Sequence, residues 1–504
     1  MAIDSKKIAQ NTVFLYFRFL LILGVTLYVS RVLLSKLGVE DYGLYNAVVS
    51  VIGMISFITH TLSSGTSRFI TFELGKSEGS KLKITFTTAL YAHIIWAVAI
   101  LIIGETVGLW YVHNKLVVPP DRVFAARIVY QVSVFLTFFS IMRVPFMSTI
   151  VAHEKMNAYA YIGIYEAFIR FGAAYAISLF DGDKLINYSI LLFIALLSVS
   201  IIYVLYSRFH FEEARFSIRH DNRILVDILK FSGWNILANL SNTLSKQGVI
   251  LLFNLFFTPI VVAAQAIGNQ VSRGLAMLVQ NVRAAVNPQV IKLYADGSRK
   301  ESEKLTLLSS EFVFYLLMIV GFPMIMVMPT LLDLWLEEVP DYAVVFARFL
   351  VLEMILENFN NAYYYPMLAA NKISLNSILE VAICALQFVI LYLLFKMGLG
   401  PVWARYVGLV VIVLFSFVEK PILLWKIVGY DIKSLFNTIS RCIMTMTVAV
   451  VLNIGLYFIM PQDTLINCLY VCIISAVVVT IPCMLFLQKE HKKMLKRLIS
   501  RKHH

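Results

Sequence analysis

Ionisable side chains inside long apolar stretches are the residues of this sequence best suited to chemistry. A charged group at the centre of a bilayer costs roughly 2.5–3.5 kcal/mol even on a lenient insertion scale, so it marks a pathway or a binding site. The cations of this kind are Arg18, Arg31, Arg143, Arg170, Lys246 and Arg273. The acids of this kind are Glu166, Glu353, Glu357 and Glu380. The stretches that carry Arg18, Lys246 and Arg273 contain no acid, which favours a binding site for an anion.

Polar side chains accompany two of these cations at helical spacing. Intervals of three and four residues place each set on one helix face. The two sets are Asn235, Asn239 and Asn242 with Lys246, and Gln265 and Asn269 with Arg273. A guanidinium offers a planar fork of donors that matches phosphate, and an ammonium adds a mobile point charge. The pattern predicts a cleft that holds phosphate through its cations and sugar through its amides, as a pyrophosphate-linked lipid oligosaccharide requires.

Other interpretations of the same residues stay open. Arg18 and Arg143 lie within about two turns of a helix end, where long side chains can reach the headgroups. Glu166 and Arg170 are spaced four residues apart and can form an internal pair. Glu353 and Glu357 share one helix face and fit either a proton or sodium coupling site or counter-ions for basic residues, with the second favoured. No metal site and no cofactor are expected.

The composition requires a membrane as the environment of these helices. Of 504 residues, 60% are hydrophobic and 14% are charged, and mean hydropathy is +0.79. Five late cysteines exclude a disulfide scaffold, and the high hydrophobicity excludes disorder. Each span needs about 20 mostly apolar residues. We expect an all-α polytopic membrane protein with about 14 spans, over 12–34, 44–67, 85–110, 123–150, 158–180, 186–207, 231–257, 259–283, 310–332, 343–369, 375–397, 402–426, 438–460 and 464–487.

The distribution of Lys and Arg predicts the orientation of the chain. If the N-terminus is cytoplasmic, the cytoplasmic connections hold about 29 of these residues and the opposite side about 9. This asymmetry predicts that both termini are cytoplasmic. It also explains the net charge of +13 through contact with anionic lipid headgroups, without a nucleic-acid partner.

The span pattern repeats after about 220 residues, which is typical of secondary transporters built from two halves. Spans 1–6 match spans 7–12 in order and spacing, and an even number of spans makes the repeat parallel. The longest connections, around 208–230 and 284–309, are too short for a soluble catalytic domain. The expected parts are a six-helix bundle at 1–207, a cytoplasmic linker at 208–230, a second bundle at 231–426, two further helices at 427–487 and a basic tail at 488–504.

Enzyme motifs are missing from the sequence. It contains no Gly-rich phosphate loop with Lys, no HExxH and no nucleophile elbow. Any driving force must therefore come from ion gradients, the membrane potential or consumption of the product. A membrane-embedded glycan polymerase or ligase is an alternative of another class, but it would need a large outer loop that this chain lacks.

The opening block carries a family resemblance. It contains Asn11-Thr12, Tyr16, Arg18, the run Leu27–Arg31, the run Leu37–Tyr45 with the pattern LGxxxYGxY, and Ser67-Arg68-Phe69. This block resembles the Wzx-type O-antigen and polysaccharide flippases of the multidrug/oligosaccharidyl-lipid/polysaccharide (MOP) exporter superfamily, with residue-level similarity confined to about the first 80 residues.

The resemblance implies two rocking six-helix bundles in the bacterial inner membrane around a central cavity. It implies an undecaprenyl-pyrophosphate-linked oligosaccharide as substrate, and Arg18, Arg31, Lys246 and Arg273 as basic cavity residues. Membrane lipids, a glycan polymerase and glycosyltransferases are the candidate partners. Two relatives compete within the superfamily. The lipid II flippases share fourteen helices, and the ion-coupled multidrug exporters typically have twelve helices and an acid in the first or seventh.

Overall fold

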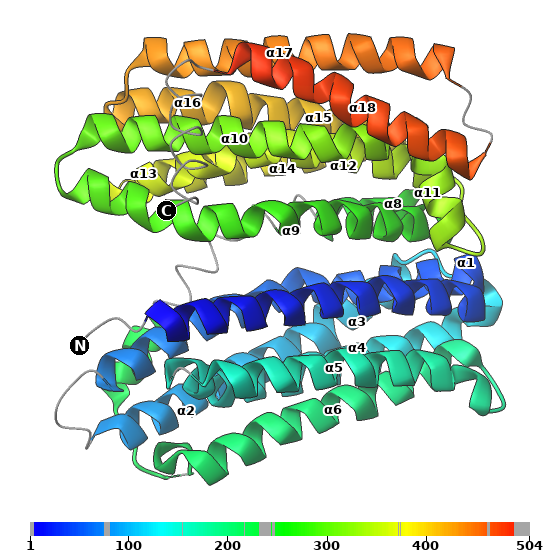
Figure 1. Cartoon of the computed structure of the whole chain (residues 1–504). Coiled ribbons are helices and arrows are strands. Elements are labelled where there is room, and N and C mark those ends of the chain that lie inside the picture. Colours follow the sequence, from blue (N-terminus) through cyan, green and yellow to red (C-terminus); the bar gives the residue numbers. More distant parts are fainter. Residues whose placement is uncertain are drawn as a thin grey trace. The chain divides into compact units, whose positions relative to one another are not determined.

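The computed structural model confirms an all-α polytopic membrane protein: every regular element among its described residues is a helix (Figure 1). The structure describes residues 5–74, 81–153, 155–215, 217–230, 243, 247–370, 372, 374–460 and 464–487. Within these ranges, it describes no side chains for 5–20, 54–61, 64–65, 68, 280–281, 284–285 and 288. Contacts divide the chain into two units, one of Met1–Ala263 with Leu336–Glu338 and one of Ala264–Trp335 with Val339–His504.

The first unit is a bundle around α4, which packs against α1, α2 and α6. Its first two predicted spans are the two arms of one element, because α1 is interrupted by a kink at Gly38. Its third span continues from α2 through a π-helical segment, η2, into α3. The helices are α1 (Ser5–Leu74), α2 (Leu82–Ile103), η2 (Gly104–Gly108), α3 (Leu109–Asn114), α4 (Val123–Ala152), α5 (Met156–Ala176), α6 (Lys184–His210) and α8 (Val249–Phe256).

The second unit is organised around α10, which packs against α12, α17 and α18. Its helix from Trp403 to Val428 alternates between α-helical and π-helical segments. The elements are α9 (Pro259–Ala295, whose first turn groups with the first unit), α10 (Arg299–Met326), α11 (Met328–Trp335), α12 (Ala343–Asn360), α13 (Tyr364–Ala369), α14 (Ser374–Lys396), α15 (Trp403–Leu414), η8 (Phe415–Glu419), α16 (Lys420–Leu423), η9 (Leu424–Val428), α17 (Ile432–Ile459) and α18 (Leu465–Phe486).

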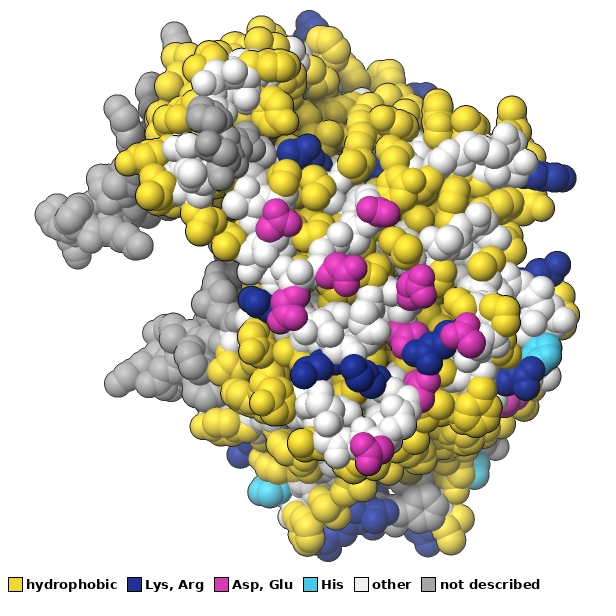
Figure 2. All heavy atoms as spheres, turned by 90° about the vertical axis from the view of Figure 1, so that its right-hand side faces the viewer, with side chains coloured by type: hydrophobic (Ala, Val, Ile, Leu, Met, Phe, Trp, Pro, Cys, Tyr) yellow, Lys and Arg dark blue, Asp and Glu magenta, His cyan; other side chains and the backbone are white. Residues whose placement is uncertain are grey.

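Among the described residues, ten helices are long and apolar enough to cross a membrane. Hydrophobic side chains cover much of the face shown in Figure 2. The predicted connection at 284–309 is wrong, because α9 continues to Ala295 and α10 begins at Arg299. Charged residues lower the mean hydropathy and so end a predicted span, but they do not end the helix. With 37 residues, α9 is about 55 Å long, well beyond the about 30 Å of a hydrocarbon core.

The corner within α1 explains the LGxxxYGxY pattern as a structural motif. Gly38 has φ 77° and ψ 171°, a conformation that glycine adopts without steric cost. A Cβ on Gly43 would lie 2.0 Å from the carbonyl oxygen of Pro259, so this position has no room for a side chain. Arg122 binds the carboxylates of both Asp41 and Asp183. The motif therefore fixes the turn between two helical arms.

A tyrosine accounts for the π-helical segment η2. Tyr130 is fully buried on α4, and its hydroxyl donates to the carbonyl oxygen of Gly104 at 2.6 Å. A Cβ on Gly108 would lie 2.1 Å from the same hydroxyl oxygen. The two glycines that bound η2 thus leave space for the tyrosine, and α4 is fixed in depth and rotation against α2. Arg143 lies farther along the same α4.

Candidate functional site

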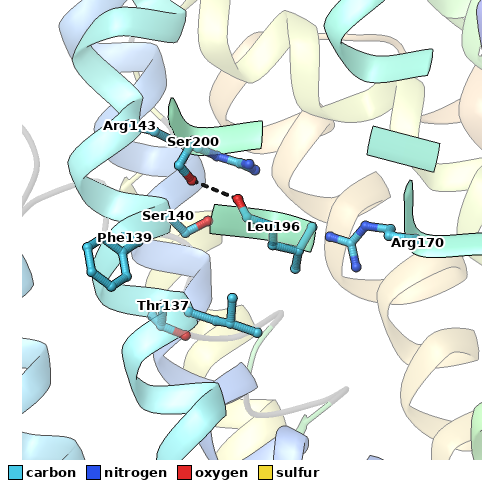
Figure 3. Close-up of a pocket in the computed structure, with 8 residues that line it drawn as sticks. Thr137, Phe139, Ser140, Arg143, Arg170, Leu196 and Ser200 are labelled. Carbon is cyan, nitrogen blue, oxygen red and sulfur yellow. Dashed lines mark hydrogen bonds between the residues drawn. The ribbon is translucent and has the colours of Figure 1, made fainter. Parts of the chain in front are cut away.

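A pocket with two arginines lies inside the first unit, between α4, α5 and α6. Its volume is about 130 Å³, and Figure 3 shows Arg143 and Arg170 entering it from opposite sides. The lining residues are Leu136, Thr137, Phe139, Ser140, Arg143, Arg170, Leu196 and Ser200. Five of them come from α4, where intervals of three and four residues bring them to one face. The pocket therefore combines guanidinium groups, hydroxyls and an apolar wall.

Glu166 links the two arginines. Its Oε1 accepts hydrogen bonds from Arg170 Nη2 at 2.8 Å and Arg170 Nε at 3.2 Å. Its Oε2 lies 3.6 Å from Arg143 Nη1, and the Glu166 and Arg143 side chains are 21% and 18% exposed. Two cations and one carboxylate leave this group with an excess of one positive charge. The expected pair of Glu166 and Arg170 is present, and Arg143 joins it from a neighbouring helix.

The surroundings hold Arg143 in place and leave the pocket polar. Its guanidinium lies over the ring of Tyr203 on α6, with 5.7 Å from Cζ to the ring centroid, an arrangement that stabilises a cation. Ser200 donates to the carbonyl oxygen of Leu196 at 3.1 Å (Figure 3). Thr137 donates to Ser133 at 2.9 Å. Both hydroxyl oxygens retain acceptor lone pairs, so the arginines supply the donors that suit an anion.

Arg31 is not among the described residues that line this pocket. Arg31 lies on α1, where its Nε is 3.9 Å from Glu337 Oε1, and its side chain is 40% exposed. Ser35 donates to the other oxygen of Glu337 at 2.5 Å. Arg18 belongs to α1, and its side chain lies outside the described residues. The predicted polar set Asn235, Asn239, Asn242 and Lys246 also lies outside the described residues.

The second polar set forms a chain of hydrogen bonds along α9. Gln265 Nε2 donates to Asn269 Oδ1 at 3.1 Å. Arg273 Nε donates to the carbonyl oxygen of Asn269 at 3.2 Å. Arg273 is exposed and Gln265 is buried. The spacing of four residues thus gives one connected face of amides that ends in a cation.

Glu353 is the partner of a buried arginine. Its Oε2 lies 3.4 Å from Arg405 Nη1, and the side chains are 12% and 5% exposed. Gly408 permits this approach, because a Cβ there would lie 3.0 Å from Glu353 Oε1. One turn later, Glu357 interacts electrostatically with Arg283. Both acids of this helix therefore have an arginine as an electrostatic partner within the described chain.

A polar cluster in the second unit was not predicted from the sequence. Lys420 Nζ lies 3.0 Å from Glu380 Oε1 and donates to Asn360 Oδ1, also at 3.0 Å. Asn360 donates in turn to Ser416 at 2.6 Å. Both carboxylate oxygens of the adjacent Glu419 are buried and have no hydrogen-bond partner among the described residues. Lys420 is counted among the cytoplasmic basic residues when the orientation is predicted. It nevertheless lies inside the predicted span 402–426, and this position is the sign in the sequence that it is an intramembrane cation.

A second missed pair joins α10 to α17. Glu311 is fully buried, and its Oε1 lies 3.5 Å from Arg441 Nε. Tyr315 donates to the same carboxylate at 3.2 Å. Arg441 is also counted among the cytoplasmic cations, although it lies inside the predicted span 438–460. The helix instead begins at Ile432, after Asp431, whose carboxylate accepts hydrogen bonds from the Lys433 and Ser434 amides. Recognising that cap would have placed Arg441 more than two turns into the helix instead of near its start.

Metal chemistry has no support in the part of the chain that the structure describes, where no group of three or more His, Cys, Asp or Glu side chains could hold an ion. The five cysteines are all free thiols.

Sequence comparison and structural comparison give different results for this chain. No protein-family model matches the sequence, and no curated protein matches it. Solved structures do match over most of its length, at identities that show the fold alone.

One similar structure is described as the lipid II flippase MurJ in an inward closed conformation. It has a TM-score of 0.71 at 11% identity and covers 97% of this chain and 100% of its own. Another is an inward-facing multidrug resistance MATE family transporter of the MOP superfamily. It has a TM-score of 0.64 at 16% identity and covers 78% of this chain and 92% of its own.

A third similar structure is a MOP superfamily transporter from Pyrococcus furiosus. It has a TM-score of 0.52 at 15% identity and covers 80% of this chain and 93% of its own. Its description states that a binding pocket of reversed polarity suggests a different function for that protein. By their descriptions all three are transporters or flippases, and none is an enzyme. The chain therefore has the fold of the multi-pass membrane transporters of the MOP superfamily.

Proposed function

We propose that this chain is a flippase for an undecaprenyl-pyrophosphate-linked oligosaccharide, which it moves from the cytoplasmic to the periplasmic leaflet of a bacterial inner membrane. The observation that carries the proposal is the pocket of Arg143 and Arg170 between three helices that are long and apolar enough to cross a membrane. An excess positive charge inside a membrane protein costs free energy unless a bound anionic substrate neutralises it. The fold supports transport as the purpose of the pocket.

In this proposal Arg143 and Arg170 contact the pyrophosphate. Guanidinium groups bind phosphate oxygens through two parallel hydrogen bonds and stay charged at every physiological pH. Arg18, Arg31, Lys246 and Arg273 are proposed as further cations along the path. The amides of Asn235, Asn239, Asn242, Gln265 and Asn269 are proposed to contact sugar hydroxyls.

The proposed organisation follows the repeat. The two six-helix bundles are 1–207 and 231–426, joined by the linker 208–230 and followed by helices within 427–487 and the tail 488–504. Both termini are proposed to be cytoplasmic. A glycan polymerase and glycosyltransferases are the proposed partners, because one consumes the exported lipid-linked glycan and the others make it.

Two other functions on the same fold have specific support. A lipid II substrate is favoured by the full-length match to MurJ. Export of cationic drugs is favoured by the MATE matches, but the excess positive charge of the pocket would repel such substrates. All three substrate classes can be separated by genetics.

Deletion of the gene in its host tests the proposal. We expect the lipid-linked repeat unit to be made and to accumulate in the cytoplasmic leaflet, with loss of surface glycan, as measured by lipid extraction and glycan blotting. Normal surface glycan with raised sensitivity to cationic dyes would establish drug export instead. Arrested peptidoglycan synthesis would establish a lipid II substrate.

Complementation of that deletion tests the residues. We expect Arg143→Ala and Arg170→Ala each to reduce surface glycan at least tenfold at normal expression, because each change removes one phosphate ligand. Lys246→Ala and Arg273→Ala are expected to have the same effect if those residues lie on the path. The control is Arg127→Ala, since Arg127 is exposed and contacts His113 outside the pocket. Full activity of both pocket variants would remove this pocket from the path.

The acids of α12 allow a separate test of coupling. Because Glu353 neutralises Arg405, we expect Glu353→Gln to reduce the yield of folded protein without changing the ion dependence of the remainder. Glu357→Gln tests the next turn of the helix. A change in the pH or sodium dependence of glycan export at normal yield would identify either residue as a coupling site.

A further inference from the structure

A carboxylate stands between the two arginines of the proposed phosphate site. We propose that Glu166 is a resident counter-ion that the substrate phosphate displaces, so that Glu166 sets how tightly the pocket binds and how readily it releases. This inference rests on the proposed function. It assigns a specificity-determining role to a residue that is otherwise half of an ordinary helical ion pair.

The two carboxylate oxygens of Glu166 are held unequally, and this difference makes displacement of Glu166 by phosphate feasible. Two donors of Arg170 converge on the single oxygen Oε1, at 2.8 and 3.2 Å. The other oxygen, Oε2, is 3.6 Å from Arg143, beyond the 2.7–2.9 Å typical of a charge-assisted hydrogen bond. Arg143 is therefore attracted by Glu166 without being tightly bound. A phosphate that enters the pocket can therefore bind Arg143 without first breaking a short hydrogen bond to Glu166.

The charges explain why the pocket contains a carboxylate at all. An uncompensated charge inside a membrane protein is strongly destabilising, so two bare guanidinium groups would be costly in the empty protein. A single carboxylate offsets one of them and leaves one positive charge to attract an anion. A pyrophosphate carries more negative charge than Glu166 and can replace it. When Glu166 returns to the arginines, it again offsets one of their two positive charges, and this favours release of the pyrophosphate.

The position of Glu166 on α5 also favours exchange. It lies one helical turn before Arg170, so the pair can separate by side-chain rotation within one helix. Arg143 belongs to α4 and is held over Tyr203. The pocket thus has one fixed cation and one cation that shares its helix with the competing carboxylate.

The direct test measures binding of farnesyl pyrophosphate, with farnesol as the uncharged analogue, to the purified full-length protein in nanodiscs. We expect Glu166→Gln to bind farnesyl pyrophosphate roughly tenfold more tightly than the wild type, with no change for farnesol, because the competing charge is gone. The control is Glu105→Gln. Glu105 is also an acid of the first unit, and it accepts a hydrogen bond from Gln131 at 3.1 Å, outside the pocket.

Export provides the second readout. Glu166→Gln is expected to bind more tightly and yet to lower surface glycan at normal expression, because release becomes slow. Unchanged affinity would show that Glu166 stays in place while substrate binds. Weaker affinity would show that Glu166 only positions the arginines. Either result overturns the inference.

A second background keeps the test valid if Glu166→Gln does not fold. Arg170→Gln leaves Arg143 and Glu166 with no net charge, and adding Glu166→Gln to it restores one positive charge. We expect the double variant to bind farnesyl pyrophosphate more tightly than Arg170→Gln alone. Equal affinities would contradict the competition between Glu166 and phosphate.

The failure of this inference differs from failure of the proposed function. If the wild type binds farnesyl pyrophosphate and farnesol equally, and Arg143→Gln changes neither, the pocket takes no phosphate and the proposed function loses its support. If pyrophosphate binding depends on Arg143 but not on Glu166, only the counter-ion role is lost.

Discussion

At the scale of single residues, the described charges inside the second unit occur largely as pairs drawn from different helices. Arg405 has Glu353, Lys420 has Glu380 and Arg441 has Glu311. Each pair brings together side chains more than 25 residues apart, so each acts as a connection between helices. In the first unit, the group around Glu166 differs because it contains one more cation than carboxylates.

Removal of the acid from one of these pairs is expected to lower the stability of the second unit. Glu311→Gln leaves Arg441 facing a neutral group in the interior, and we expect a loss of about 3–5 kcal/mol of stability. Replacing both residues by Gln and Met is expected to recover much of this loss. Thermal unfolding of the purified variants measures both changes. If the single and double variants are equally unstable, the ion pair is not the cause.

Residue types explain what sequence reasoning can find at this scale. Glu166 and Arg170 are predictable because one helix and a spacing of four residues determine their contact. Arg143 reaches them from α4, and its contact depends on how α4 is rotated within the bundle, where Tyr130 of α4 donates to Gly104 at the end of α2. Hydropathy contains no information about that rotation. Glu311 and Lys420 were missed for a related reason, since their partners lie on other helices.

At the scale of elements, hydropathy predicts where helices occur and glycine determines how closely they approach. All fourteen predicted spans overlap helical segments in the described chain, and the kink of α1 at Gly38 lies between the first two predicted spans, 12–34 and 44–67. The π-helical segments η2 and η8 are not predictable from hydropathy, because each lies within one continuous predicted span, 85–110 or 402–426. At η2, the two glycines leave space for the Tyr130 side chain of α4.

Gly43 gives a test of close approach. We expect Gly43→Ala to lower the yield of folded protein and the midpoint of thermal unfolding, because its Cβ would overlap the Pro259 carbonyl. Gly24→Ala is a matched control on the same helix. Its Cβ would meet no atom within 4 Å, and alanine is favoured over glycine in a helix by about 1 kcal/mol. Equal stability of the two variants would contradict this account of the motif.

Asp431 gives a test of helix capping. The Ser434 hydroxyl and the Ser434 and Lys433 backbone amides donate to its carboxylate and hold its pKa below the usual 3.8. A lowered native pKa means that the cap stabilises α17 above pH 3.8 and that this stabilisation is lost as pH falls through the native value. We expect Asp431→Ala to unfold at a lower temperature than the wild type at pH 7. At pH 3 this difference should be smaller, and a difference independent of pH would exclude the carboxylate as its source.

At the scale of the whole molecule, the distribution of basic residues predicts the orientation, which the folded helices alone do not determine. A green fluorescent protein fused after His504 is expected to fluoresce, and an alkaline phosphatase fused at the same point is expected to be inactive. Both results follow from a cytoplasmic C-terminus. The reverse pattern would invert the proposed direction of every helix and of the substrate path.

The length of α9 has a practical consequence. Because α9 ends at Ala295 and α10 begins at Arg299, only a tight turn separates two helices, and α9 exceeds the thickness of the lipid layer. A small rigid helical protein inserted in frame at 296–298 would extend these two helices as a continuous hairpin. Such a fusion would give single-particle images a fixed marker outside the micelle for a molecule that is otherwise largely enclosed by detergent.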